Sequence, residues 1–263
     1  MQTTFTKEQL DDPEVARADR ILRRCVHCGL CTATCPTYVV LGDERDSPRG
    51  RIYAIKDMLE KGIDAKPEVS KHIDRCLSCF SCMTTCPSGV DYMHLVEIAR
   101  EHIEKTGRRS LKDRLVRKAL TEIVPYPRRF RWAMRAAPLG RRLSNVFRTL
   151  KMPELAAMVD LAPANLPGGG RFSGPGTASP TGVRTGRVIL LAGCAQQVLR
   201  PQINDATIRL FARGGIDVIV SAGAGCCGAL SQHIGREEEA VKFARANVAA
   251  WSKEIDKGGV DAV

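Results

Sequence analysis

The sequence predicts an α+β protein of more than one domain: a mainly helical domain that contains most of the cysteines, a helical basic connector, and an incomplete α/β domain built on a parallel sheet. Three observations predict this fold class. Eight of the eleven cysteines lie in residues 1–107, among short helical patterns. Fourteen of the 40 Lys and Arg residues lie in residues 108–151, beside two acidic residues. From residue 187 onward, short apolar runs alternate with amphipathic stretches, as strands and helices do in a doubly wound sheet.

The helices expected in the first domain are marked by capping residues. Asp12 followed by proline predicts a helix start after a polar N-terminal stretch that has no charged-then-apolar export signal. Residues 47–62 begin with Ser-Pro and end in glycine, which predicts a second helix. Residues 91–107 carry apolar side chains three and four positions apart and predict a third. Without an export signal we expect the cysteines to meet a reducing cytosol, where thiols bind metals more often than they pair.

Two stretches separate this domain from the last one. The basic connector is expected over residues 108–161, with an amphipathic helix between Leu139 and Leu150. Residues 162–186 are rich in Gly, Pro, Ser and Thr and predict a flexible linker. In residues 187–263 we expect strands at 187–193 and 216–223, helices at 201–215 and 236–259, and the start of a third strand at 260–263. No apolar run approaches the roughly 20 residues that span a bilayer.

Two cysteine motifs share one spacing. CVHCGLCTATCP contains Cys25, Cys28, Cys31 and Cys35, and CLSCFSCMTTCP contains Cys76, Cys79, Cys82 and Cys86. Both have gaps of two, two and three residues and close with proline. This is the bacterial ferredoxin pattern for two [4Fe–4S] clusters, in which the fourth cysteine of each motif ligates the other motif's cluster.

The pattern therefore predicts a two-cluster ferredoxin-type domain at residues 1–107, with its motifs near 16–45 and 67–96. The expected ligands are Cys25, Cys28, Cys31 and Cys86 for one cluster, and Cys76, Cys79, Cys82 and Cys35 for the other. Zinc is the alternative, but zinc sites usually present two separated cysteine pairs. His27 is expected to be a neighbour of the first cluster rather than a ligand. Two adjacent clusters suit the transfer of single electrons, and no catalytic acid or base is predicted.

Three further cysteines lie at the expected carboxyl ends of two strands, where open α/β sheets place their chemistry. Cys194 follows the first strand, and Cys226 and Cys227 follow the second. A G-x-G-x-x-G pattern beginning at Gly223 offers nucleotide binding as another interpretation. The acidic residue expected about 20 positions later is not at a strand end, which argues against a nucleotide site.

Residues 25–60, 72–100 and 190–230 resemble the iron–sulfur subunits of bacterial glycolate oxidase and their relatives in anaerobic glycerol-3-phosphate dehydrogenases and heterodisulfide reductases. The resemblance implies an electron-transfer subunit of an FAD-dependent glycolate oxidase, inactive on glycolate by itself. It would pass electrons singly from FAD-containing subunits through two [4Fe–4S] clusters toward a membrane quinone-type acceptor. One alternative is the same role beside a lactate or glycerol-3-phosphate dehydrogenase. Another is a zinc-stabilised scaffold or nucleic-acid-binding protein.

The resemblance also implies that Cys194, Cys226 and Cys227 begin the motif of a cysteine-rich domain, at residues 187–263. In that family a last cysteine-bearing stretch and a second domain copy follow, so we expect a form shortened at the C-terminus. A third iron–sulfur centre on these three residues is expected if the domain is completed. Three thiols without a ligand are the alternative.

The basic segment at residues 108–151 has three interpretations: contact with a membrane or its quinone, packing against a partner subunit, or a plain connector. Its aromatic residues are few and no nucleic-acid motif accompanies them, so no nucleic-acid partner is expected. Phe130 and Trp132 beside arginines would suit a lipid headgroup interface. The expected location is the cytoplasm, with peripheral attachment to the cytoplasmic face of the inner membrane as an alternative.

Overall fold

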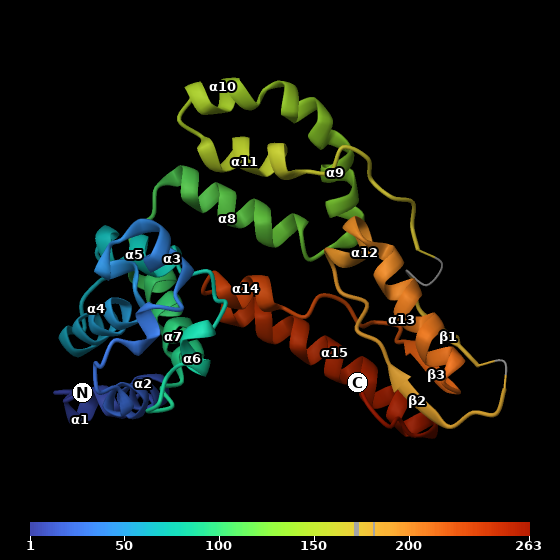
Figure 1. Cartoon of the computed structure of the whole chain (residues 1–263), viewed down its shortest axis with the longest axis horizontal. Helices are drawn as coiled ribbons and strands as arrows, with labels where there is room; N and C mark the ends of the chain where they lie inside the picture. Colours follow the sequence, from blue (N-terminus) through green and yellow to red (C-terminus); the bar gives the residue numbers. More distant parts are fainter. Residues whose placement is uncertain (171–173, 181) are drawn as a thin grey trace. The chain divides into compact units, whose positions relative to one another are not determined.

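The computed structural model describes residues 1–170, 174–180 and 182–263 (Figure 1). The chain divides into two compact units: unit 1 contains Met1–Arg114 and Leu230–Glu237, and unit 2 contains Leu115–Ala229 and Glu238–Val263. The parts of the expected linker at residues 171–173 and 181 lie outside the described residues. The structure is mainly helical with one small sheet, which confirms the predicted α+β class.

Unit 1 is helical. Its elements are α1 (Lys7–Leu10), α2 (Pro13–Arg24), the 3-10 turn η1 (Leu30–Thr32), α3 (Pro36–Leu41), the 3-10 turn η2 (Glu44–Asp46), α4 (Pro48–Lys61), α5 (Pro67–Asp74), α6 (Ser81–Thr84) and α7 (Tyr92–Thr106). The predicted caps are present: the Asp12 carboxylate accepts from the Glu14 amide at 2.8 Å, and the Ser47 hydroxyl accepts from the Gly50 amide at 2.9 Å. Because caps satisfy amides that the helix leaves unpaired, local sequence sets where α2 and α4 begin.

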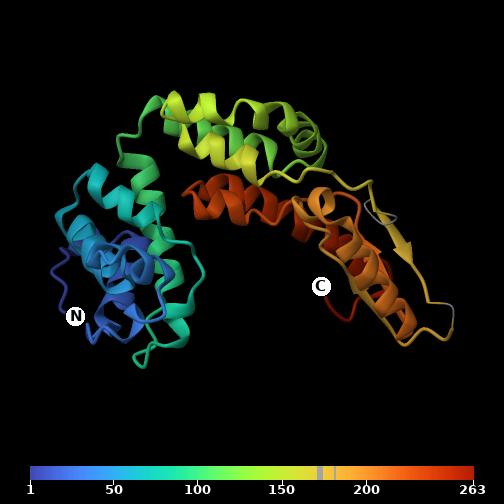
Figure 2. The same cartoon turned by 45° about the horizontal axis from the view of Figure 1, so that its top comes forward.

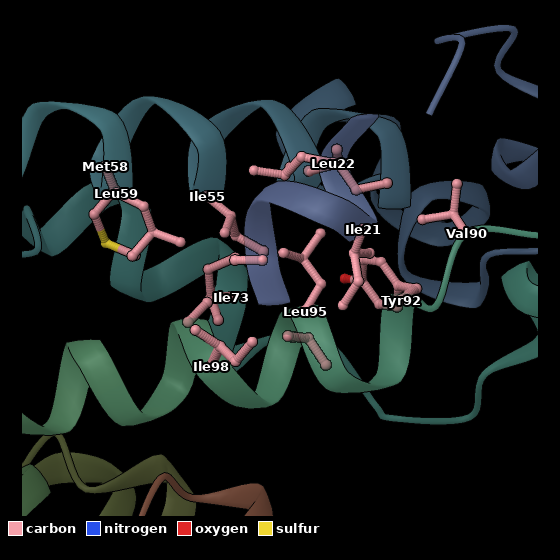
Figure 3. Close-up of a cluster of buried hydrophobic side chains, with 14 of the residues drawn as sticks. Ile21, Leu22, Ile55, Met58, Leu59, Ile73, Val90, Tyr92, Leu95 and Ile98 are labelled. Atoms are coloured by element: carbon pink, nitrogen blue, oxygen red, sulfur yellow. The ribbon is translucent and has the colours of Figure 1, made fainter. Parts of the chain in front are cut away.

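The core of unit 1 lies between α2, α4, α5 and α7. Figure 3 shows Leu95 and Ile98 of α7 directed toward side chains of the other helices. The fully buried side chains include Leu22, Ile55, Ile73 and Leu95, each 0% exposed. Cys25 and Cys82 belong to the same buried cluster, so this core anchors both cysteine loops.

The basic segment folds into α8 (Leu111–Ile123), α9 (Pro127–Arg142) and α10 (Ser144–Thr149), followed by α11 (Pro153–Leu161). Figures 1 and 2 show α9, α10 and α11 side by side within unit 2. The prediction of one helix through residues 139–150 is wrong, because Leu143 leaves helical geometry with φ −99° and ψ 4°. Phe130 is only 8% exposed, so the expectation that it faces lipid headgroups is also wrong.

The sheet of unit 2 has the order β1-β3-β2. β2 (Gly186–Ile189) and β3 (Ile216–Val220) pair in parallel, as predicted, and are joined through α12 (Gln196–Leu199) and α13 (Pro201–Arg213). Their register places Val188 opposite Val218. β1 (Gly176–Ala178) pairs antiparallel with β3. It was not predicted, because Gly-Thr-Ala lies in the expected linker and has no apolar alternation.

The last two helices are α14 (Ala229–His233) and α15 (Glu237–Gly258). After α15 the chain reaches the free edge of β2, where the Ile189 amide donates to the Ala262 carbonyl at 2.9 Å. Val188 and Ala262 form a parallel bridge, at the place where a third strand was expected. In the described ranges, no helix combines the length and the apolar character needed to cross a membrane.

Candidate metal centres

The two cysteine loops of unit 1 repeat one unusual backbone conformation. His27 and Ser78, each two residues after the first cysteine of its motif, have φ of 59° and 52°. Gly29 and Phe80, each directly after the second cysteine, have φ of 83° and 55°. A left-handed conformation costs a non-glycine residue roughly 1–2 kcal/mol, and such strain concentrates at functional sites. Left-handed turns can also gather backbone N–H groups into a concavity that binds anions, as in many Fe–S sites.

These loops bring the eight motif cysteines into two groups. One recess is lined by Cys25, Cys28, Cys31 and Cys86, with Cys82 at its wall. The second recess is lined by Cys35, Cys76, Cys79 and Cys82. The fourth cysteine of each motif thus lies with the first three of the other motif, and Cys82 borders both recesses. All eleven cysteines are free thiols.

The first turn of α3 aims Cys35 away from its own motif. Cys35 is the residue before the helix and Pro36 occupies the first helical position, so the cysteine has extended backbone geometry. Its side chain is 7% exposed. The Cys35 Sγ lies 3.2 Å from the Thr37 hydroxyl and 3.8 Å from Nη1 of Arg51.

The thiols cannot all ionise unaided. Burial, followed by the charges of nearby cysteines, raises the pKa of Cys82 to about 12. Burial also raises the pKa of Cys31, whereas a hydrogen bond from the Ser81 amide lowers the pKa of Cys79. A bound metal centre supplies the positive charge that holds such groups as thiolates. Two recesses with four thiols each therefore fit two iron–sulfur cubes.

A buried network of charges lies beneath Cys35. Asp46 at the end of η2 is 0% exposed and Arg51 on α4 is 1% exposed. The Asp46 carboxylate receives Arg51 Nη2 at 3.4 Å, His72 Nδ1 at 2.9 Å and Arg75 Nη1 at 2.8 Å. Burial alone would raise the pKa of Asp46, but the hydrogen bonds of His72 and Arg75 and their charges hold that pKa below its usual value.

Sequence reasoning missed this network, although one signal was available. Arg51 occupies a position of α4 that faces the core, next to Ile52 and one turn before Ile55. A charged side chain within an apolar helical stripe is rarely buried without a partner. That pattern marks Arg51 as a residue with a structural or functional role.

The second loop is also fixed by buried side chains. Tyr92, 3% exposed, donates its hydroxyl to Cys76 Sγ at 3.7 Å. Arg100 donates to the Ser78 hydroxyl at 2.6 Å and to the Cys76 carbonyl at 2.7 Å. In the first loop, His27 packs edge-on against Tyr53 with ring centroids 6.2 Å apart.

The segment Leu230–Glu237 belongs to unit 1 and packs beside this second loop. The His233 ring lies 6.4 Å from the Phe80 ring, centroid to centroid. Gly235, with φ 84°, meets the backbone of Arg100 so closely that a β-carbon there would lie 2.4 Å from the Arg100 carbonyl oxygen. Only glycine fits this contact.

The remaining three cysteines meet in unit 2. The sulfur atoms of Cys194 and Cys226 are 3.5 Å apart, and Cys227 is exposed beside them. The hydrogen bond from Cys226 lowers the pKa of Cys194 to about 7, and the same contact raises the pKa of Cys226. Asn247 of α15 clamps the turn, accepting from the Gly225 amide and donating to the Cys226 carbonyl, each at 2.8 Å. Sequence reasoning did not single out Asn247.

Comparison with known proteins matches both parts of the chain. Residues 21–90 match the 4Fe-4S dicluster domain family, and residues 188–263 match the cysteine-rich domain family. The chain is 43% identical over 98% of its length to the glycolate oxidase iron-sulfur subunit of Escherichia coli. It is 32% identical over 93% of its length to the probable glycolate oxidase iron-sulfur subunit of Bacillus subtilis.

The chain spans 59% and 56% of the lengths of these two relatives. A more distant relative is one of the subunits of the dihydromethanophenazine:CoB–CoM heterodisulfide reductase of Methanosarcina mazei, 31% identical over 33% of this chain and 25% of that protein. No solved structure matches the chain.

The Asp46 network makes a prediction about stability. Replacing Asp46 by Asn leaves the Arg51 charge buried with a weaker partner, so the free energy of unfolding should fall by roughly 3–5 kcal/mol. Because the folded state lowers the pKa of Asp46, its contribution is complete above the usual value of 3.8 and is lost as the pH falls through the folded value. Urea unfolding followed by circular dichroism measures the difference.

The control for this variant is Asp43→Asn, in the same turn. Asp43 pairs with Arg45, whose side chain is 65% exposed and open to solvent screening, so its loss should cost much less than the loss of Asp46. Equal losses in the two variants would contradict a special role for the buried carboxylate.

Proposed function

Because the chain belongs to the iron–sulfur proteins that join a 4Fe-4S dicluster domain to a cysteine-rich domain, we propose that it is the electron-carrying subunit of a glycolate-oxidising complex. It resembles glycolate oxidase iron–sulfur subunits over nearly its whole length. The observation that carries the proposal is the pair of four-cysteine recesses that share Cys82 as a common wall. Neighbouring centres suit the passage of electrons one at a time.

The proposed ligands follow the two recesses. Cys25, Cys28, Cys31 and Cys86 hold one [4Fe–4S] cluster, and Cys35, Cys76, Cys79 and Cys82 hold the other. When bound, the clusters supply reversible one-electron transfer. The protein supplies thiolates and orients the second loop through Tyr92 and Arg100.

The partner follows from the relatives that match over most of the chain. A flavin-containing subunit would oxidise glycolate and pass the electrons to this chain, which hands them to a membrane quinone. The heterodisulfide reductase relatives support a role in electron transfer, although their names indicate a different substrate. Cys194, Cys226 and Cys227 offer three thiols for a third centre, with the sulfur atoms of Cys194 and Cys226 3.5 Å apart.

Metal analysis tests this proposal directly. After anaerobic purification we expect about eight iron and eight sulfide per chain, because each cube holds four of each. More than eight irons would assign a third centre to Cys194, Cys226 and Cys227. Zinc without sulfide would overturn the proposal in favour of a zinc-stabilised scaffold.

Four single variants test the exchange of the fourth ligands. If Cys35 belongs to the second recess, Cys35→Ser and Cys79→Ser should lose the same cluster and leave identical EPR spectra after reduction. Cys86→Ser and Cys28→Ser should share the other residual spectrum. Each variant should retain about four of about eight irons. A Cys35→Ser spectrum that matches Cys28→Ser would show that each motif keeps its own fourth cysteine.

One face of α9 supports a membrane contact. Arg128, Trp132, Arg135, Leu139 and Arg142 are exposed and follow the spacing of a single helical stripe. Trp132 is 70% exposed and Leu139 is 68% exposed, with arginines between and beside them. Aromatic and aliphatic side chains framed by cations suit the headgroup region of an anionic membrane.

Vesicle binding tests this face. The intact chain should sediment with phosphatidylglycerol-containing vesicles and less with phosphatidylcholine vesicles, since the stripe is cationic. The double variant Trp132→Ala/Leu139→Ala should bind at least about tenfold more weakly. Leu161→Ala is the control, because Leu161 is 84% exposed on α11 and lies off the stripe. Equal binding by all three proteins would exclude this face and favour packing against a partner subunit.

A further inference from the structure

We propose that Arg51 makes the centre held through Cys35 the more easily reduced of the two. This inference rests on the proposed function, because it assumes that both recesses hold clusters. It assigns a positioning role to a residue outside both cysteine motifs. The order of reduction would then be built into unit 1 by one buried guanidinium.

Each of the three nitrogen atoms of the Arg51 guanidinium contacts a polar or sulfur atom. Nε donates to the His72 carbonyl at 2.7 Å, and Nη2 donates to the Thr37 hydroxyl at 3.0 Å. These contacts leave Nη1 aimed at Cys35 Sγ, at 3.8 Å. The side chain is 1% exposed, so neither water nor salt screens its charge effectively. The guanidinium also stays protonated at every accessible pH.

Asp46 does not cancel this charge. Its single carboxylate is shared by two guanidiniums, those of Arg51 and Arg75, and by the His72 ring. The carboxylate lies nearer to Arg75, at 2.8 Å, than to Arg51, at 3.4 Å. The local balance beside Cys35 is therefore positive. The two other acidic residues of this turn are also paired, Asp43 with Arg45 and Glu44 with Arg49.

Among the described residues, no cation beside the first recess is as deeply buried as Arg51. The N-terminal ammonium of Met1 donates to the Cys25 carbonyl but is only partly buried. Arg49 approaches the loop of this recess, since a β-carbon added to Gly29 would lie 2.6 Å from Arg49 Nη1. That side chain, however, is 34% exposed and pairs with Glu44 at 2.8 Å, so water and a carboxylate offset its charge. Cys86 Sγ receives the backbone amide of Val90 at 3.5 Å.

The difference between the recesses has a direct redox consequence. Reduction adds one negative charge to a centre already bound by four thiolates. A buried cation and hydrogen bonds to the ligand sulfur stabilise the reduced form more than the oxidised form, which raises the reduction potential. The centre bound by Cys35, Cys76, Cys79 and Cys82 should therefore accept the first electron.

An EPR-monitored redox titration of the loaded full chain tests the inference. The signal that Cys35→Ser abolishes should be the one reduced at the higher potential in the unsubstituted protein. In Arg51→Met, that centre should become harder to reduce by about tenfold in equilibrium constant, or about 59 mV for one electron. The other centre should keep its potential. Arg51→Lys retains the positive charge without the planar guanidinium, so the potential of this centre should lie between those of the unsubstituted protein and Arg51→Met. This variant replaces Arg51→Met in the test if Arg51→Met does not fold.

Arg75→Met is the matched control. Arg75 binds the same carboxylate but is 40% exposed and contacts no cysteine sulfur among the described hydrogen bonds, so its loss should shift the potential of the Cys35 centre by clearly less than Arg51→Met does. Unchanged potentials in both Arg51 variants, or an equal shift in Arg75→Met, would overturn the inference. A chain that loads no iron would instead refute the proposed function, so the two failures are distinguishable.

Discussion

The buried carboxylate of Asp46 is the interaction on which the arrangement of unit 1 depends. It joins three separate segments: the turn that carries it, α4 through Arg51, and α5 with the residue after it through His72 and Arg75. α5 leads directly into the second cysteine motif, whereas the Asp46 turn follows the first. One desolvated charge therefore sets the distance between the two motifs. Removing any partner would leave the remaining charges buried, so the segments are held together.

The grouping of cysteines follows from this constraint. Because both motifs are held close together, the fourth cysteine of each can reach the recess of the other, and Cys82 borders both. Metal binding would then link the two cysteine motifs to each other, and the free energy of metal binding would add to that of folding. The apolar core around Leu95 supplies the rigid base, and the left-handed residues of each loop turn the backbone toward its recess. The two recesses share a backbone plan but differ in charge.

In unit 2, too, a polar side chain distant in the sequence fixes the turn that carries a cysteine. Its parallel strands place Cys194 and Cys226 at neighbouring carboxyl ends, and Asn247 holds the second turn from a helix that follows later in the chain. The residues immediately after that turn, Leu230–Glu237, belong to unit 1 and pack beside the loop of Cys76.

The sequence by itself determined the features that arise from neighbours in the chain. The spacing of the eight cysteines, the caps at Asp12 and Ser47, and the apolar runs of β2 and β3 act over a few residues, so pattern alone predicts the loops, helix starts and parallel strands. Only the tertiary structure placed Arg51 against Cys35, Asn247 against Cys226, and β1 on the edge of β3. These contacts join residues 16 to 44 positions apart. They depend on how every intervening element packs, and a local pattern does not encode that packing.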